Sequence, residues 1–163
     1  MERIMNYTIR EIREDEYPLL EDFLYEAIFI PEGVEPPPRS IVREPELQVY
    51  IEGFGTRAHD RALVAEVEGR IAGAVWVRIM DDYGHVDDET PSFAISLYKE
   101  YRGCGIGTEM MKRMLDILKR CGYARASLAV QKANCAVRMY RSVGFEIVGE
   151  NEEEYIMVCQ LST

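Results

Sequence analysis

The sequence lacks the features that mark several common classes of protein. Its 19 lysines and arginines are outnumbered by 29 aspartates and glutamates, which gives a net charge of -10. This argues against a nucleic-acid partner, because binding to a phosphate backbone needs a basic face. No apolar run approaches the length of a membrane span, and no signal peptide is recognisable. The four cysteines show no C-x-x-C pair and no metal-ligand spacing. We therefore expect a cytoplasmic protein with reduced thiols, no metal, and neither a membrane nor a nucleic-acid partner.

What the sequence does contain predicts a single domain over residues 1–163, in which strands and helices are interspersed. Alternating apolar residues and turn signals predict strands over 8–12, 61–68, 70–80, 93–98, 126–130, 145–148 and 155–159. Helical spacing predicts one helix capped by Asp15 and further helices over 46–53, 108–120 and 135–143. Strands 61–68 and 70–80 are apolar on both faces, so we expect helices on both sides of the sheet.

A glycine-rich turn joins the predicted strand 93–98 to the helix that follows it. Gly103, Gly105 and Gly107 stand at alternate positions, where they leave backbone amides uncovered by side chains. Exposed amides beside the positive end of a helix dipole form a binding site for phosphate. The dinucleotide fingerprint does not fit, because its third glycine would fall at Thr108, and the nucleotide P-loop lacks its Lys followed by Ser or Thr. The structural alternative is a tight turn whose glycines only supply positive φ.

Two motifs resemble those of the GNAT superfamily of N-acetyltransferases. Residues 102–107 read Arg-x-x-Gly-x-Gly, which resembles motif A, Gln/Arg-x-x-Gly-x-Gly/Ala. The run 134–145, NCAVRMYRSVGF, resembles motif B, Asn-x-x-Ala-x-x-(Leu/Met)-Tyr-x-x-x-Gly-Phe. One departure is that the alanine falls at Ala136, one place early, with Val137 in its usual position. The two motifs together are far more specific than either alone, and the resemblance covers most of residues 61–160.

The resemblance implies an α/β (α+β) fold: a mixed, mostly antiparallel sheet of about seven strands, splayed beside the glycine loop and flanked by about four helices. Acetyl-CoA would lie in that split, with its pyrophosphate on the loop amides and its peptide-like arm along the edge of strand 93–98. The residues implied to bind it are Ile95, Ser96, Leu97, Arg102, Gly103, Cys104, Gly105, Ile106, Gly107, Thr108 and Asn134. A salt bridge to a helix is the alternative role for Arg102, and capping of the next helix is the alternative for Asn134.

The resemblance also implies direct attack of a neutral amine on the thioester. Tyr140 would be the general acid that protonates the departing thiolate, and an ordinary phenol holds its proton at neutral pH; a buried, structural aromatic is the alternative. Members of the family often carry a glutamate where this chain has Pro91. Glu89 is therefore the first candidate for the base, His85 the second and a water chain the third. The solvated-turn interpretation of the acidic loop 81–89 stays open.

The region between the first two strands forms one wall of the acceptor site in proteins of this kind. The resemblance thus makes Phe29, Tyr50 and Phe54 candidate substrate-binding residues, with core packing as the alternative for each ring. We expect an acetyl-CoA-dependent N-acetyltransferase acting on a primary amine of a small molecule or peptide. A catalytically inactive CoA-binding sensor of the same fold is the second hypothesis, and a nucleotide-binding enzyme is the third. The acceptor and the oligomeric state stay open, with a homodimer among the options.

Overall fold

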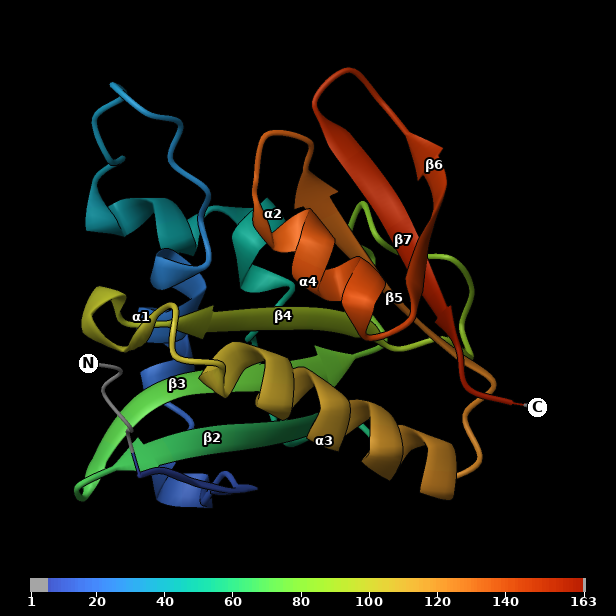
Figure 1. Cartoon of the computed structure of the whole chain (residues 1–163), viewed down its shortest axis with the longest axis horizontal. Helices are drawn as coiled ribbons and strands as arrows, with labels where there is room; N and C mark the ends of the chain where they lie inside the picture. The colour runs from blue at the N-terminus through green and yellow to red at the C-terminus, as the bar shows by residue number, and fades with distance from the viewer. Residues whose placement is uncertain (1–5, 163) are drawn as a thin grey trace.

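Seven strands form one sheet in the order β1-β2-β3-β4-β5-β7-β6, and only β4 and β5 run parallel (Figure 1). The computed structural model describes residues 6–162. The strands in that range are β1 (Thr8–Glu11), β2 (Arg61–Val67), β3 (Arg70–Arg78), β4 (Ser92–Leu97), β5 (Arg125–Gln131), β6 (Phe145–Glu150) and β7 (Glu154–Gln160). The α-helices are α1 (Leu19–Glu26), α2 (Pro45–Gln48), α3 (Ile106–Arg120) and α4 (Ala136–Ser142). Short 3₁₀ turns are η1 (Glu14–Glu16), η2 (Arg39–Arg43) and η3 (Lys99–Tyr101). The predicted fold class is confirmed.

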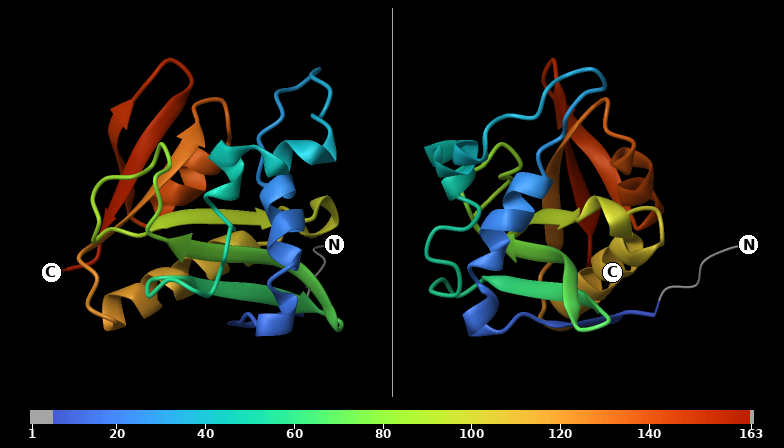
Figure 2. Two further views of the ribbon diagram at one scale, coloured as in Figure 1. Left: turned by 180° about the vertical axis from the view of Figure 1, so that it is seen from behind. Right: turned by 90° about the vertical axis from the view of Figure 1, so that its left-hand side faces the viewer.

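Helices cover both faces of the sheet, as the views from the front and from behind show (Figures 1 and 2). The methionine-rich face of α3 and the buried face of α4 pack on one side, against alternate residues of β3 such as Val75 and Val77. On the other side α1 packs against the intervening residues Ala74 and Trp76. Because both faces of β3 are covered, its side chains from Ala72 onward are buried, which explains the continuous apolar run in the sequence.

Two helix starts differ from the prediction. Asp15 does not cap the first helix: it lies inside η1, and α1 begins only at Leu19 with Pro18 before it and no side-chain cap. The carboxylate that closes this turn is Glu16, which accepts a 2.8 Å hydrogen bond from the Arg13 N–H. Helix α3 begins at Ile106 and not at residue 108. Gly105, the residue directly before it, caps the helix in a left-handed conformation (φ 84°).

Neither a membrane-spanning helix nor a metal-binding cluster is found within residues 6–162. No helix there is long and apolar enough to cross a membrane. Within the same residues, no group of three or more His, Cys, Asp or Glu is arranged to hold a metal ion.

Candidate active site

Strands β4 and β5 touch at one end only. They share a single paired position, Ser92 with Ser127. There the Ser127 N–H donates to the Pro91 carbonyl (2.9 Å), and the two serine hydroxyls lie 3.3 Å apart. Beyond this position the strands diverge toward their carboxyl ends (Figure 1). The split that the sequence predicted in the sheet is present.

The divergence leaves the inner edge of β4 without a partner strand. Tyr98 N–H donates to the Ala72 carbonyl of β3 (3.0 Å), whereas the Pro91 carbonyl faces β5. Because successive residues of a strand point their backbone groups to opposite sides, Ile95 and Leu97 point theirs into the gap. This edge can accept an extended, amide-containing ligand as an additional strand.

The glycine loop presents a row of free amides at the carboxyl end of β4. Gly103 (φ 77°) and Gly105 (φ 84°) both adopt left-handed conformations that suit glycine. The N–H groups of residues 103–108 have no acceptor among residues 6–162, and the first helical bond runs from Glu109 N–H to the Gly105 carbonyl (3.2 Å). Free amides at the positive end of a 15-residue helix favour an anion. Ile106 and Cys104 contribute their backbone N–H groups to this row. The side chain of Ile106 is buried in the core, and that of Cys104 is exposed.

Arg102 is turned away from this row. Its Nε donates to the Leu97 carbonyl (2.8 Å) and its Nη2 pairs with the Glu26 carboxylate (3.2 Å). The guanidinium thus joins the end of β4 to the end of α1. The salt-bridge alternative is the one that the structure contains.

A cavity of about 260 Å³ lies between the parted strands. Residues 93–95 and 128–131 form its two sides, α1 and the segment after it contribute Leu24 and residues 27–29, and α4 contributes Tyr140. Among the predicted site residues Ile95, Asn134, Phe29, Tyr50 and Tyr140 line this one space. The split of the sheet therefore brings together residues that are more than a hundred positions apart in the sequence.

Tyr140 places a polar group in an apolar setting. The residue is 9% exposed, its ring lies 6.2 Å from that of Phe145, and its hydroxyl has no hydrogen-bond partner among the described residues. Burial raises the pKa of Tyr140 to about 12. The phenol therefore holds its proton at neutral pH and can give it to a strong base that forms in the cavity.

Asn134 and Ser96 have structural contacts. The Asn134 Oδ1 accepts from the Ala136 N–H (2.9 Å), which caps the start of α4 and leaves the side-chain NH₂ free of that bond. The Ser96 hydroxyl donates to the Phe23 carbonyl (2.6 Å) on the α1 side of the sheet, and Ser96 does not line the cavity. Ser96 therefore fixes α1 on β4, and only its neighbours face the gap.

Tyr50 lines the cavity, and both its backbone carbonyl and its hydroxyl are hydrogen-bonded. Its carbonyl accepts from the Trp76 indole N–H (3.0 Å), and its hydroxyl donates to Asp82 Oδ2 (3.1 Å). Burial and the Asp82 charge raise the pKa of Tyr50, so it stays neutral. The other Asp82 oxygen, Oδ1, accepts from the Ser92 hydroxyl (3.1 Å).

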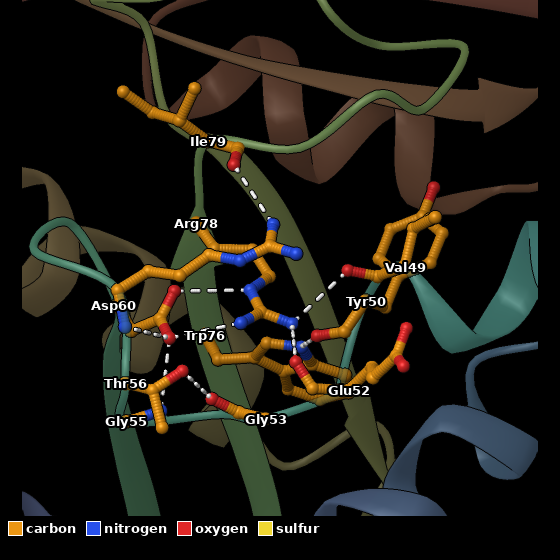
Figure 3. A network of polar contacts seen from close by, with 11 residues as sticks. Val49, Tyr50, Glu52, Gly53, Gly55, Thr56, Asp60, Trp76, Arg78 and Ile79 are labelled. Atoms are coloured by element: carbon orange, nitrogen blue, oxygen red, sulfur yellow. Dashed lines mark hydrogen bonds and ion pairs between the residues drawn. The ribbon is translucent and has the colours of Figure 1, made fainter.

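A buried ion pair positions the backbone around Tyr50 (Figure 3). The Arg78 guanidinium binds both carboxylate oxygens of Asp60 at 3.0 Å, and it also donates to the carbonyls of Val49 (3.1 Å) and Glu52 (2.9 Å). Both charged side chains are wholly buried. The segment between α2 and β2 is thereby attached to β3 on either side of Tyr50.

Two carboxylates at this end of the cavity were not predicted as site residues. Glu154, the first residue of β7, lines the cavity. Asp82 does not line it but accepts the hydrogen bond of the Tyr50 hydroxyl. Burial raises the pKa of both groups, and for Glu154 the nearby Glu153 and Asp82 charges add to the effect. No local signal separates Glu154 from its neighbours Glu152 and Glu153; only the pairing of Glu154 with Gln131 of β5 identifies it.

The structure places both predicted bases of the acidic loop, and one predicted residue of the acceptor wall, outside the cavity. Glu89 is exposed, in a turn where its N–H donates to Asp87 Oδ1 (2.8 Å). His85 lies in the same loop, 3.4 Å from Asp88. Phe54 is 8% exposed, packs edge-on against Tyr17, and lines a separate cavity at the β1–β2 edge of the sheet. Its apolar ring packs in the core between α1 and the sheet, which is the core-packing alternative given for it from the sequence.

Comparisons with known proteins agree with this geometry. A model of the Acetyltransferase (GNAT) family matches residues 7–145. The PaiA N-acetyltransferase of Thermoplasma acidophilum, solved in complex with coenzyme A, superposes with a TM-score of 0.71 at 18% identity, over 96% of this chain and 99% of that one. This likeness shows the fold.

Two curated relatives match part of the chain. Mycothiol acetyltransferase of Thermobifida fusca (strain YX) is 34% identical over 83 residues, which is 48% of this chain and 26% of that protein. [Ribosomal protein bS18]-alanine N-acetyltransferase of Haemophilus influenzae (strain ATCC 51907 / DSM 11121 / KW20 / Rd) is 29% identical over 85 residues, 45% of this chain and 58% of that protein. The chain thus spans from about a quarter to under two thirds of the length of these relatives.

Proposed function

The chain belongs to the GNAT family of acetyltransferases, and we propose that it transfers an acetyl group from acetyl-CoA to a primary amine of a small molecule or peptide. The observation that carries the proposal is the row of free amides at residues 103–108 beside the open edge of β4. A phosphate site that adjoins a strand-like groove suits a ligand with a pyrophosphate and a peptide-like arm.

The residues present fit acetyl-CoA. The amides of residues 103–108 would hold the pyrophosphate, with the α3 dipole favouring its charge. The N–H and carbonyl of Ile95 and the N–H of Leu97 would pair with the pantetheine arm, since the Leu97 carbonyl already accepts from Arg102. The free NH₂ of Asn134 is a further donor toward the arm. Arg102 would support the loop through β4 and α1, because its guanidinium is bound to the Leu97 carbonyl and the Glu26 carboxylate.

Acetyl-CoA supplies a thioester whose carbonyl carbon accepts the amine. Holding both reactants in one cavity makes the attack effectively intramolecular. Tyr140 would then give its proton to the thiolate that leaves, which its buried, neutral phenol is suited to do. Phe29 and Tyr50 would form the wall against which the acceptor lies.

A catalytically inactive coenzyme A-binding module is the second candidate. The exposed position of Glu89 favours it, because the base expected from the sequence does not reach the cavity. The free loop amides and the unpaired hydroxyl of Tyr140 fit both candidates, so a measurement of turnover decides between them.

A thermal-shift titration followed by a thiol-release assay tests the proposal. A ligand that binds only the folded protein raises its melting temperature, so acetyl-CoA should stabilise the chain while ATP and NAD should not. Thiol release with a panel of primary amines should then show acceptor-dependent turnover. Stabilisation without turnover on any amine would support the binding module, and stabilisation by ATP or NAD alone would overturn both.

A further inference from the structure

Acetyl transfer requires a group that removes a proton from the acceptor, because an amine is protonated at neutral pH and an ammonium cannot attack. Among the described residues that line the cavity, Glu154 is the one carboxylate, and none is lysine, arginine or histidine. We propose that Glu154 binds the ammonium of the acceptor and takes its proton, and that the acceptor is a primary amine with no carboxylate beside that amine. This inference rests on the proposed acetyl transfer and adds its base and its substrate class.

The backbone of Glu154 is fixed from two directions. Glu154 pairs with Gln131 at the end of β5, and its N–H donates to Asn151 Oδ1 (2.7 Å). The neighbouring carbonyl of Glu153 accepts from the Lys132 N–H (2.8 Å). The position therefore belongs to the rigid edge of the split and not to a mobile loop tip.

The carboxylate itself is uncommitted. Within residues 6–162 the Glu154 side chain takes part in no ion pair and no hydrogen bond, although it lies at the wall of a half-enclosed cavity. Lys132, a cation whose backbone N–H is bonded to the adjacent Glu153 carbonyl, pairs with Glu150 (3.0 Å) and lies over the ring of Tyr155. A partly desolvated carboxylate without a protein partner favours a cationic ligand.

The surroundings of Glu154 make it a stronger base than an exposed glutamate. Burial raises its pKa, and the Glu153 and Asp82 charges raise it further. Tyr50 contributes a neutral hydroxyl bonded to Asp82. A higher pKa brings the carboxylate closer to the amine in proton affinity, which favours proton transfer at neutral pH.

A second, independent observation points to the same space. Tyr140, nine-tenths buried, exposes an unpartnered hydroxyl in the cavity that Glu154 lines. The acid and the base of one reaction thus share one cavity.

One proton passes from the ammonium to Glu154, and the amine nitrogen bonds to the thioester carbon. The carbon–sulfur bond breaks and the thiolate takes the Tyr140 proton. The second proton lost by the nitrogen restores Tyr140 through solvent, and Glu154 releases the first proton to solvent, so the net products are the amide, the thiol and one proton.

The same charges define what the cavity excludes. A carboxylate on the carbon that bears the amine would enter beside Glu154 and near Asp82, with no lining cation to pair with it. Like charges at short range repel most strongly where water is excluded. Tyramine and histamine should therefore be accepted in preference to tyrosine and histidine, which differ from them only by the carboxylate.

The test compares Glu154→Gln with Glu152→Gln, a nearby and exposed residue with the same change in charge. With tyramine, Glu154→Gln should lower kcat/KM by about 10²-fold or more and should remove the acidic limb of its pH profile. Glu152→Gln should stay within about twofold, and acetyl-CoA should stabilise both variants as it does the wild type. Full turnover and an unchanged pH profile in Glu154→Gln would overturn the inference.

A binding experiment separates this inference from the proposed function. With coenzyme A present and no acetyl donor, tyramine should raise the melting temperature of the wild type more than tyrosine does, and Glu154→Gln should reduce that difference. Equal effects of the two ligands would overturn the substrate class even if acetyl transfer is observed. Absence of acetyl-CoA binding would instead overturn the proposed function. If Glu154→Gln does not fold, Glu154→Asp, which keeps the charge but shortens its reach, should retain tyramine selectivity with reduced turnover; loss of that selectivity would count against the inference.

Discussion

Arg78 and Asp60 form a two-bond ion pair, with both N–O distances 3.0 Å and both side chains wholly buried. The same guanidinium donates to the carbonyls of Val49 and Glu52, on either side of Tyr50. A charge pair in the core thus positions the backbone on either side of a residue that lines the cavity.

Removal of one partner should destabilise the protein strongly. In Asp60→Asn the Arg78 charge stays buried without a counter-charge, and we expect a loss of about 3–5 kcal/mol in the free energy of unfolding. Urea unfolding measures this. Asp116→Asn, which breaks the exposed Asp116–Arg120 pair (2.7 Å), is the control and should change stability by less than about 1 kcal/mol. Similar effects of the two substitutions would contradict the role given to the buried pair.

Substitution at the glycine loop should weaken binding more than it weakens the fold. Gly105→Ala places a side chain at φ 84° where no atom lies within 4 Å, so the expected loss is about 1–2 kcal/mol of backbone strain. Gly33→Ala has the same open space at φ 81° and lies in another loop, between α1 and η2. Both should lose similar stability in urea unfolding, but only Gly105→Ala should reduce the affinity for acetyl-CoA by calorimetry. Equal affinities in the two variants would exclude the loop as the phosphate site.

Tyr140→Phe should separate catalysis from binding. The hydroxyl has no hydrogen-bond partner within residues 6–162, so its removal should change the free energy of unfolding by less than about 1 kcal/mol and leave acetyl-CoA stabilisation intact. Turnover should fall by about 10²–10⁴-fold if the phenol is the general acid. Because the pKa of Tyr140 is raised to about 12, wild-type turnover should show no alkaline decline from this group until the pH approaches that value. Tyr155→Phe is the matched control, and a similar loss of rate in both variants would point to packing.

Glu16 should give the protein a component of acid sensitivity. Its hydrogen bonds with Arg10, at 2.8 Å, and with the Arg13 N–H lower the pKa of Glu16 from 4.5 to about 2. A lowered pKa stabilises the fold above the unfolded value and loses that contribution as the pH falls through the folded value. The stability difference between wild type and Glu16→Gln should therefore be full at pH 7 and shrink between about pH 4.5 and pH 2. A difference that does not vary with pH, or one matched by Glu14→Gln at the exposed neighbour, would refute this.

The parts of the fold that could be predicted are those with local signals. Helical spacing located α3 because its methionines all face the sheet, and three alternate glycines identified the free amides because glycine acts on its own backbone. The capping role of Asn134 also followed, since the donor of its bond, the Ala136 N–H, is only two residues away. By contrast, Asp15 was expected as a cap from its residue type, whereas the turn is closed by Glu16.

The parts of the site that could not be predicted depend on pairing between distant segments. Glu154 reaches the cavity because β7 pairs with β5 and places it opposite Gln131. Asp82 meets Tyr50 across 32 positions of sequence. Glu89 was preferred for its closeness to β4 in the sequence, but the turn closed by Asp87 leaves it on the surface. Phe54 could serve a wall or a core equally well by its chemistry, and only the packed structure decides.

The central claim is that the amides of residues 103–108 hold the pyrophosphate of coenzyme A beside the open edge of β4. Titration of ¹⁵N-labelled protein with coenzyme A, followed by amide NMR, tests it most directly. We predict the largest chemical-shift changes at residues 103–108, with further changes at Ile95 and Leu97. Changes confined to the other cavity, around Tyr17 and Arg61, or none at the glycine loop at saturating ligand, would contradict the claim.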